Sequence, residues 1–337
     1  MVEARFWESA EGNQVRCGLC RFRCLIGVGR RGVCGVRENR DGTLYTLVYG
    51  KSIAEQVDPI EKKPLYHVLP GSLAYSIATV GCNFRCLHCQ NHQISQWPQG
   101  QAAIPGQELP PAELVRRALA AGCRSIAYTY TEPTIYLEYA YDTAVLARAA
   151  GLKNIFVSNG YITPEALAVV APYLDAANID LKGFTEEFYR EVAGATLQGV
   201  LDSLREYRRL GIWLEVTTLV IPGHNDSDAD LKGIAGFIAG ELGREVPWHV
   251  TAFYPTYRLA NLPPTPVAAL HRARRHGQEA GLHFVYAGNI PGAGGEETRC
   301  PACGQGLIDR NGFLVLEMKV HHGSCGHCGA AVPGIWF

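Results

Sequence analysis

The sequence lacks the features that would place a protein in a membrane or outside the cell. No stretch approaches the roughly 18 consecutive apolar residues of a membrane-spanning helix. The opening residues, MVEARFWESAEG, contain acids and no long apolar run, unlike a signal peptide. The formal net charge is −1, so overall charge provides no attraction to a polyanion such as nucleic acid. These absences predict a soluble, cytoplasmic protein without a membrane partner.

Cysteine, in contrast, is abundant. The 337 residues are 47% hydrophobic, enough for one large domain with appendages or for two domains, and they include 12 cysteines. Clustered cysteines in a cytosolic chain indicate metal binding, whereas a disulfide framework is typical of small, secreted, loop-rich proteins. All but Cys123 fall into three clusters: Cys17, Cys20, Cys24 and Cys34; Cys82, Cys86 and Cys89; Cys300, Cys303, Cys325 and Cys328.

Apolar, β-branched runs alternate with helix-like stretches through the middle of the chain. We expect strands at 73–81, 125–130, 154–159, 176–182, 213–221, 247–255 and 283–288. We expect helices at 110–122, 134–151, 163–174, 197–211, 226–243 and about 264–281. This alternation predicts an α/β protein with a parallel sheet, closed into a barrel or partial barrel, with an open doubly wound sheet as the alternative.

The cysteine clusters divide the chain into four expected regions. Residues 1–50 form a four-cysteine module, 51–71 a connector, 72–295 the α/β barrel, and 296–337 a second cysteine module. In a barrel of parallel strands the active site lies at the carboxyl ends of the strands, so the segments that follow each strand are the places to search for function.

The segment CNFRCLHCQN follows the first expected barrel strand and holds Cys82, Cys86 and Cys89. Structural zinc sites usually supply four ligands as two pairs. Three thiolates on one loop suit three irons of a [4Fe–4S] cluster, whose fourth iron stays open for a ligand from outside the chain. The alternative is a zinc site completed by His88 or His92, although His88 is constrained by the cysteines on either side of it.

The Cys-x3-Cys-x2-Cys pattern at this position resembles the radical S-adenosylmethionine (SAM) superfamily. The likeness extends through most of residues 70–290. The segments CNFRCLHCQNHQIS, YTYTEPT, VSNGY, NIDLK and PGHND are similar to the branch that contains pyruvate formate-lyase activating enzymes. With both terminal cysteine modules, the whole chain resembles the radical SAM proteins of the AmmeMemoRadiSam system. The resemblance implies a partial (βα)6-type barrel, and SAM bound to the open iron and cleaved reductively to a 5′-deoxyadenosyl radical that abstracts hydrogen.

Polar residues at the next strand ends are candidates to bind SAM. The resemblance implies that the segment of Thr131 and Glu132 receives the SAM ammonium group, and Glu132 also suits the cap of the helix that Pro133 opens. Ser158-Asn159-Gly160 allows close backbone approach to the ligand, although Asn-Gly is also a common turn pair. Some activating enzymes have an aspartate at the position of Val157, so a cation site built on that acid is not expected here.

Later strands add further candidates. Asp180 and Lys182 lie two residues apart and share one face of a strand, where they suit ribose and the SAM carboxylate, or pair with each other. Glu215 and Thr217 likewise share a face, and a glutamate in an apolar run needs a partner, so we expect Glu215 to meet SAM or substrate. The candidates for substrate contact are His224, His249 and Tyr254.

The two terminal modules have different spacings. The tail pairs CPACG and CGHCG form a four-thiolate set, Cys300, Cys303, Cys325 and Cys328, which suits a zinc ribbon or a rubredoxin-like iron site. In the head, Cys17, Cys20, Cys24 and Cys34 suit zinc or an auxiliary [4Fe–4S] cluster equally. Seven arginines between residues 16 and 40 suit either a solvated face or a patch for an acidic partner or nucleic acid.

The sequence therefore predicts a radical SAM enzyme with a [4Fe–4S] cluster and SAM as cofactors and an unidentified substrate. A reductant such as flavodoxin or ferredoxin would supply electrons, and the resemblance implies Memo-like and AMMECR-like partners. The first alternative is an activase for a glycyl-radical enzyme. The alternative of another class is a non-catalytic iron–sulfur or zinc protein for electron transfer or nucleic-acid binding.

Overall fold

The computed structural model describes residues 1–97, 103–290 and 294–337. By Cα proximity the chain forms two compact units. The first comprises Met1–Asp58 and Leu73–Ala177, and the second comprises Pro59–Ser72 and Asn178–Phe337. The expected α/β fold with a central parallel sheet is confirmed.

The first unit begins with short antiparallel strands that hold the head cysteines. They form two three-stranded sheets in the orders β1-β6-β5 and β2-β3-β4. Their bounds are β1 Val2–Glu3, β2 Trp7–Ala10, β3 Gln14–Cys17, β4 Leu25–Ile26, β5 Arg37–Arg40 and β6 Thr43–Thr46, with a short turn of helix at Glu11–Asn13 between β2 and β3. Sequence periodicity did not indicate these strands because each is only two to four residues long.

Four neighbouring strands of the central sheet follow in the order β8-β9-β11-β12. β11 is parallel to both β9 and β12. Their bounds are β8 Ala54–Pro59, β9 Leu73–Ala78, β11 Ser125–Tyr128 and β12 Lys153–Ser158. The expectation that 51–71 is only a connector was incomplete, because it contains β8, the two-residue strand β7 Lys51–Ser52 and a helical turn at Ile60–Lys62; β7 pairs with β10 Gln107–Glu108.

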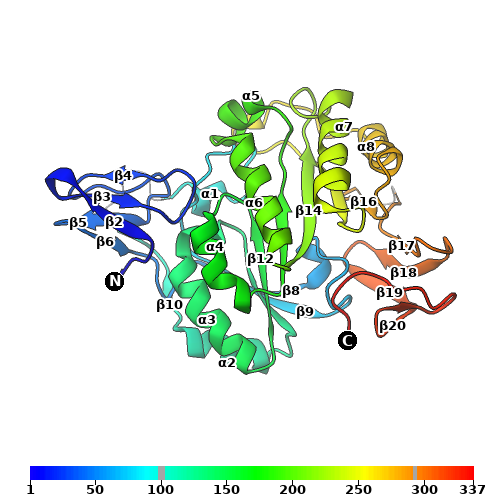
Figure 1. The fold of residues 1–337 in the computed structure, drawn as a ribbon, viewed down its shortest axis with the longest axis horizontal. Coiled ribbons are helices and arrows are strands. Elements are labelled where there is room, and N and C mark those ends of the chain that lie inside the picture. The colour runs from blue at the N-terminus through cyan, green and yellow to red at the C-terminus, as the bar shows by residue number, and fades with distance from the viewer. Residues whose placement is uncertain (98–102, 291–293) are drawn as a thin grey trace. The chain divides into compact units, whose positions relative to one another are not determined.

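Three helices of this unit lie within the ranges that the sequence indicated, whereas the four-residue helix α1 was not expected. Pro111 opens α2, which buries Leu114, Val115 and Ala118, and Gly122 follows its end with a positive φ. α2 and α3 lie side by side against β11, and α3 also packs on β12 (Figure 1). The bounds are α1 His92–Ser95, α2 Pro111–Ala120, α3 Leu137–Ala149 and α4 Pro164–Val170, with 3-10 turns at Pro133–Tyr136 and Ala171–Tyr173.

The second unit continues the same alternation in the strand order β13-β14-β15-β16. β15 is parallel to β14 and to β16. α7 and α8 lie side by side, and α8 packs on β15 and β16 (Figure 1). The bounds are β13 Ala176–Asp180, β14 Trp213–Val220, β15 Trp248–Ala252, β16 Val285–Gly288, α5 Glu186–Phe188, α6 Leu197–Arg209, α7 Asp228–Phe237 and α8 Val267–Glu279, with further helical turns at Tyr189–Ala193, Ile238–Leu242 and Tyr257–Leu259.

Two helix positions differ in detail from expectation. The helix expected at 226–243 begins at Asp228, because the Ser227 side chain accepts from the Asp230 amide and caps it. The Asp226 carboxylate, which precedes the helix, accepts a hydrogen bond from the amide of Gly223 at 2.8 Å. The short helix α5 was not expected, since three residues carry no measurable periodicity.

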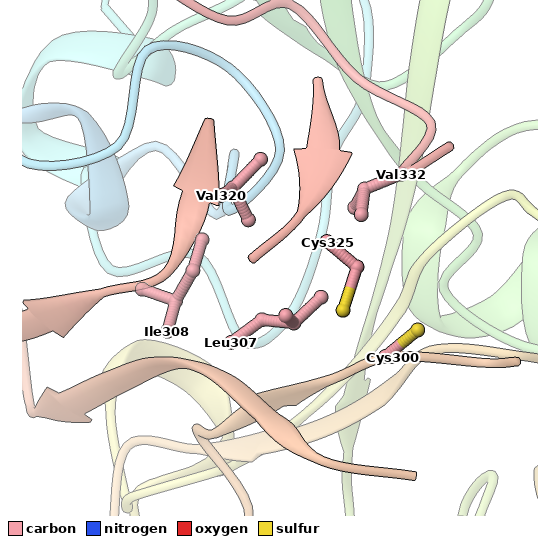
Figure 2. Close-up of a cluster of buried hydrophobic side chains, with 6 residues drawn as sticks. All are labelled: Cys300, Leu307, Ile308, Val320, Cys325 and Val332. Atoms are coloured by element: carbon pink, nitrogen blue, oxygen red, sulfur yellow. The ribbon is translucent and has the colours of Figure 1, made fainter. Parts of the chain in front are cut away.

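The tail ends the second unit as a set of short antiparallel strands. β17, β18 and β19 form one sheet in that order, and β20 pairs with β21. Leu307, Ile308, Val320 and Val332 build a small core of their own, shown in Figure 2. The bounds are β17 Thr298–Arg299, β18 Gly306–Asn311, β19 Leu314–Met318, β20 Val320–His321 and β21 Ser324–Cys325.

Candidate functional site

The three-cysteine loop leaves the carboxyl end of β9, as the barrel rule requires. Gly81 makes the turn with φ of +95°, and a Cβ built there would lie 2.7 Å from Val36 and 2.8 Å from the Cys34 carbonyl oxygen. Only glycine suits both constraints. After this turn Cys82 and Cys86 are buried, and Cys89 is half-buried.

Two of these sulfurs lie within hydrogen-bonding distance of another side chain. Asn159 Nδ2, just beyond β12, donates to Cys82 Sγ at 3.3 Å. The Phe84 amide donates to the same sulfur at 3.4 Å, and Ser95 Oγ lies 3.1 Å from Cys89 Sγ. Hydrogen bonds of this kind orient thiolate ligands and tune the metal group that they hold.

The side chain of Glu132 connects the ends of β11 and β12. Its carboxylate accepts from the Thr134 amide at 3.0 Å, the Thr134 hydroxyl at 2.6 Å, the Ser158 hydroxyl at 2.7 Å and the Asn159 amide at 2.7 Å. The Gly160 amide in turn donates to Ser158 Oγ at 3.0 Å. Glu132 therefore caps the helical turn that follows it, as one interpretation of the sequence held, and also fixes the second strand end.

Burial determines the protonation behaviour of this carboxylate. Glu132 is fully buried, and this burial raises the pKa of its carboxyl even though its hydrogen bonds to Thr134, Asn159 and Ser158 lower it. Burial likewise raises the pKa of the Cys82 thiol, followed by the nearby charge of Glu132. A metal that takes Cys82 as thiolate would displace the thiol proton.

Two residues that the sequence analysis did not single out complete this end of the sheet. Tyr130 has φ of +62°, a conformation unusual for a residue other than glycine. Asn91 Nδ2 donates to the Tyr130 carbonyl at 2.7 Å, and the Tyr130 hydroxyl donates to Asp58. Thr131 Oγ1 donates to the carbonyl of Thr79 at 2.9 Å. A strained residue held by its neighbours is typical of a ligand-binding site.

The environment of the loop fits an iron–sulfur cluster better than a zinc ion. Among the described residues, only the tail cysteines form a group whose ligand atoms, three or more, all lie within 4.8 Å of one another. Cluster ligands each bind a different iron and so stand farther apart than ligands that share one ion. Asn83 Nδ2 is also buried with no hydrogen-bond partner in the described chain, which leaves a donor for a bound group.

In the second unit the structure brings Asp180 and Lys182 together at the end of β13. Lys182 Nζ lies 2.6 Å from Asp180 Oδ2. The Lys182 side chain is 10% exposed and that of Asp180 is 33% exposed, so the pair is partly open to solvent. Asn225 Nδ2 donates to the Lys182 carbonyl at 2.6 Å and anchors this strand end. The ion pair that the sequence analysis offered as the plainer alternative is present.

Glu215 is placed differently from the expectation that it meets SAM or substrate. It is the third residue of β14, near the amino end of that strand, and it is fully buried. Its carboxylate accepts from the Tyr66 amide at 3.0 Å and the His67 amide at 2.9 Å, and it lies 2.7 Å from His249 Nε2. Trp213 Nε1 donates to it at 3.1 Å. These protein partners satisfy the carboxylate, so Glu215 has a structural role.

The remaining candidates occupy three environments. Thr217 is buried, and its Oγ1 has no hydrogen-bond partner within the described residues, so it retains capacity for a ligand. His224 is half-buried in the loop after β14, and Tyr254 is exposed, its hydroxyl donating to the Asn289 carbonyl at 3.1 Å. His249 is buried beside Glu215 and stacks on Tyr286, which agrees with the environment of a core residue.

The tail cysteines form a compact four-sulfur site. Cys300 Sγ lies 3.7 Å from Cys328 Sγ, and Cys303 Sγ lies 3.9 Å from Cys325 Sγ. Figure 2 shows Cys300 and Cys325 among the buried side chains of the small tail core. Four sulfurs about 2.3 Å from one zinc ion in a tetrahedron are about 3.8 Å apart. The arrangement therefore fits a single zinc or iron ion.

The arginine-rich head does not present a free basic surface. Five of its arginines pair with carboxylates, so the interpretation as a nucleic-acid patch loses its main support. The pairs are Arg16 with Glu8, Arg23 with Glu165, Arg31 and Arg40 with Glu38, and Arg37 with Glu138.

None of the helices in the described part of the chain is long and apolar enough to span a bilayer.

Comparison with known proteins agrees with this geometry. The family model of the radical SAM superfamily matches residues 76–232. The uncharacterized protein MJ0808 of Methanocaldococcus jannaschii is 47% identical over 334 residues, which cover 98% of this chain and 99% of that protein. Among partial matches, the isethionate sulfite-lyase activating enzyme of Nitratidesulfovibrio vulgaris is 31% identical over 121 residues, 34% of this chain and 39% of the enzyme.

A solved structure supports the fold. The radical SAM methyltransferase from Sphaerobacter thermophilus aligns with a TM-score of 0.51 at 15% identity and covers 66% of this chain and 68% of that one. At this identity the likeness concerns the fold alone. The superfamily match includes the Cys82–Cys89 loop and the ends of β9, β11 and β12, where the site geometry is concentrated.

Proposed function

Because the chain belongs to the radical SAM superfamily and is therefore an enzyme, we propose that Cys82, Cys86 and Cys89 hold a [4Fe–4S] cluster that binds SAM. When bound, this pair supplies one-electron reductive cleavage of SAM and abstraction of a hydrogen atom from a substrate. The observation that carries the proposal is that three cysteines of one loop lie beside the ends of β11 and β12. The polar groups at these two strand ends are held in place by hydrogen bonds. Asn159 links the two features through its hydrogen bond to Cys82.

Several residues of the chain have distinct proposed roles in positioning SAM at this site. Glu132 acts as a positioning residue, since its four accepted hydrogen bonds hold the ends of β11 and β12 and its burial keeps it from solvent. Thr131, Ser158, Asn159 and Gly160 then offer hydroxyl, amide and backbone groups to SAM. The unused Nδ2 of Asn83 is a donor for the cluster or its ligand.

The family resemblance adds three further residues to the proposed SAM contacts. Lys182 would pair with the SAM carboxylate, Asp180 would accept from ribose hydroxyls, and Thr217 would use its free hydroxyl. The 2.6 Å ion pair between Asp180 and Lys182 holds both charges ready without leaving either one unpaired. We leave Glu215 and His249 out of this set because they satisfy each other in the core.

The proposals for substrate contact and for partner proteins rest on the exposure of two side chains and on the family resemblance. His224 and Tyr254 are the accessible candidates for substrate contact. We propose a modification that depends on partner proteins of the Memo-like and AMMECR-like kinds, with an electron donor of the flavodoxin or ferredoxin class. The partial match to an activating enzyme makes glycyl-radical activation the second candidate.

The tail has a structural role in this proposal. Its four sulfurs enclose one zinc or iron ion and leave no coordination position open for a substrate. A site closed in this way stabilises the fold around it.

Anaerobic reconstitution with iron and sulfide, followed by SAM and dithionite, tests the proposal. Formation of 5′-deoxyadenosine and methionine supports it. A cluster that forms but leaves SAM intact, with an EPR signal that SAM does not change, would instead show the non-catalytic iron–sulfur carrier.

A further inference from the structure

The four head cysteines share the wall of one cavity. Cys17, Cys20 and Cys34 are buried and Cys24 is half-buried. Together with Gly32 and Arg37, these residues line one small pocket with a cavity volume of about 10 Å³. Four thiols that converge on one pocket from separate strands and loops form a candidate ligand set for a metal group.

The spacing of these sulfurs separates the head from the tail. All four head cysteines lie in the described stretch 1–97, yet no three of their sulfurs lie within 4.8 Å of one another. In the tail all four sulfurs meet that limit. A single tetrahedral ion needs sulfurs about 3.8 Å apart. The head is too wide for one ion and has the form expected when each cysteine binds a different iron of a cluster.

The residues around the head cysteines leave space beside the sulfurs and donate hydrogen bonds to them. A Cβ at Gly32 would lie 3.6 Å from Cys24 Sγ and 3.2 Å from Ile26, so a larger residue would intrude on the ligand. Backbone amides two residues further along donate to the sulfurs of Cys20 and Cys34. The same arrangement occurs at Cys325, whose sulfur accepts from the His327 amide at 3.4 Å.

Arg37 provides a second, independent indication of a ligand. It is 1% exposed, and its Nη1 donates to Glu138 at 2.9 Å. Its Nε, however, is buried and has no hydrogen-bond partner in the described chain. A buried donor on the wall of a cavity lined by thiols is costly unless something in the cavity accepts its hydrogen. Cluster sulfide or thiolate is such an acceptor.

The head cavity lies next to the three-cysteine loop within the same compact unit. The Arg85 side chain of the loop donates to the Val33 carbonyl, one residue before Cys34. A Cβ on Gly81 would lie 2.8 Å from the Cys34 carbonyl oxygen, which places the Cα atoms of Cys34 and Cys82 within roughly 11 Å by standard backbone dimensions.

We propose that Cys17, Cys20, Cys24 and Cys34 bind a second [4Fe–4S] cluster, fully ligated by protein, beside the Cys82–Cys89 loop. Arg37 donates to this cluster through Nε. The inference goes beyond the proposed function and does not depend on it, since the head site stands on its own residues even if the loop held no cluster.

The test uses the full chain with Cys82, Cys86 and Cys89 all changed to Ala, so that the loop cannot bind iron. After anaerobic reconstitution we expect about four irons and four sulfides per chain, with the Mössbauer spectrum of a [4Fe–4S] cluster. Adding Cys17→Ser and Cys20→Ser should remove them, whereas adding Cys123→Ala should not. Zinc in the head, or a chain that retains no iron there, would overturn the proposal.

A second measurement covers the case in which the triple variant does not fold. In the otherwise unchanged chain, Cys17→Ser/Cys20→Ser should halve the iron content and leave the tail metal in place. Dithionite-reduced unchanged chain should also give an EPR signal broadened relative to that of the head variant, because two neighbouring paramagnets couple. Equal iron in the two proteins contradicts the second cluster.

Discussion

The loop and the tail both contain cysteine pairs with the Cys-x2-Cys spacing, but the surroundings of these pairs differ. In the tail, the sulfurs of Cys300 and Cys328 lie 3.7 Å apart and those of Cys303 and Cys325 lie 3.9 Å apart, which suits one shared ion. In the loop, Cys82 instead contacts Asn159, which follows β12, and Cys89 contacts Ser95 at the end of α1. If the proposed metal groups are correct, the elements around a cysteine pair, rather than its spacing, decide whether the site closes around one ion or stays open to a further ligand.

Cys86→Ala should have the largest effect on this comparison. Loss of one of three iron ligands should abolish SAM cleavage, because the chain offers no substitute thiolate on the loop. The tail metal should be unchanged. The assay is 5′-deoxyadenosine formation together with metal analysis, with Cys123→Ala as the matched control. Cleavage retained in Cys86→Ala would remove the loop from the mechanism.

Cys300→Ala should show the reverse pattern. The tail ion should be lost and the thermal midpoint of the second unit should fall, since a structural metal contributes its binding free energy to folding. Cleavage of SAM by the surviving folded fraction should persist. Metal content and differential scanning calorimetry provide the measurements, and a tail that keeps its ion with three cysteines would contradict a four-ligand site.

Much of this comparison followed from sequence. The positions of Cys82, Cys86 and Cys89 at the end of β9 needed only spacing and strand periodicity. The bond from Asn159 to Cys82 joins residues 77 positions apart, and no local pattern predicts it. Glu215 was misassigned for a related reason: a glutamate in an apolar run does need partners, but the backbone amides of Tyr66 and His67 that satisfy it are distant in sequence.

The tail should be more sensitive to acid than the loop because of His67. The ring Nδ1 of His67 lies 2.8 Å from the Pro333 carbonyl, and Nε2 lies 2.7 Å from the Tyr286 hydroxyl. Burial lowers the pKa of His67 to about 4, against the opposing charge of Glu215 and with help from Arg310 and His249. As the pH falls, His67 therefore takes up a proton at a higher pH in the unfolded chain than in the folded one.

Stability from neutral His67 is present above its ordinary pKa of about 6.5 and is lost as the pH falls from there toward 4. The loss should reach about 3 kcal/mol at the lower limit. Urea unfolding at several pH values measures it, with His67→Asn as the comparison. An equal acid slope in that variant would assign the effect to other groups.

Glu132→Gln should weaken the loop site without removing its iron. The glutamine amide would face the Asn159 backbone donor, so at least one of the four accepted hydrogen bonds would be lost. We expect a roughly 10- to 100-fold rise in KM for SAM, the equivalent of ~1.5–3 kcal/mol for a hydrogen bond to a charged group. Steady-state kinetics test this, and iron content is the control. An unchanged KM would show that the strand ends need no carboxylate.

Asn159→Ala gives the smallest and most specific effect. The Nδ2 hydrogen bond to Cys82 Sγ stabilises negative charge on the sulfur, so its loss should disfavour the reduced cluster and make the midpoint potential more negative. The expected shift is roughly 20–60 mV, the one-electron equivalent of ~0.5–1.5 kcal/mol. Ser95→Ala, which removes the hydroxyl beside Cys89, should shift the potential in the same direction. A redox titration followed by EPR measures both, and a potential unmoved by either change would mean that these contacts shape the loop without tuning its metal.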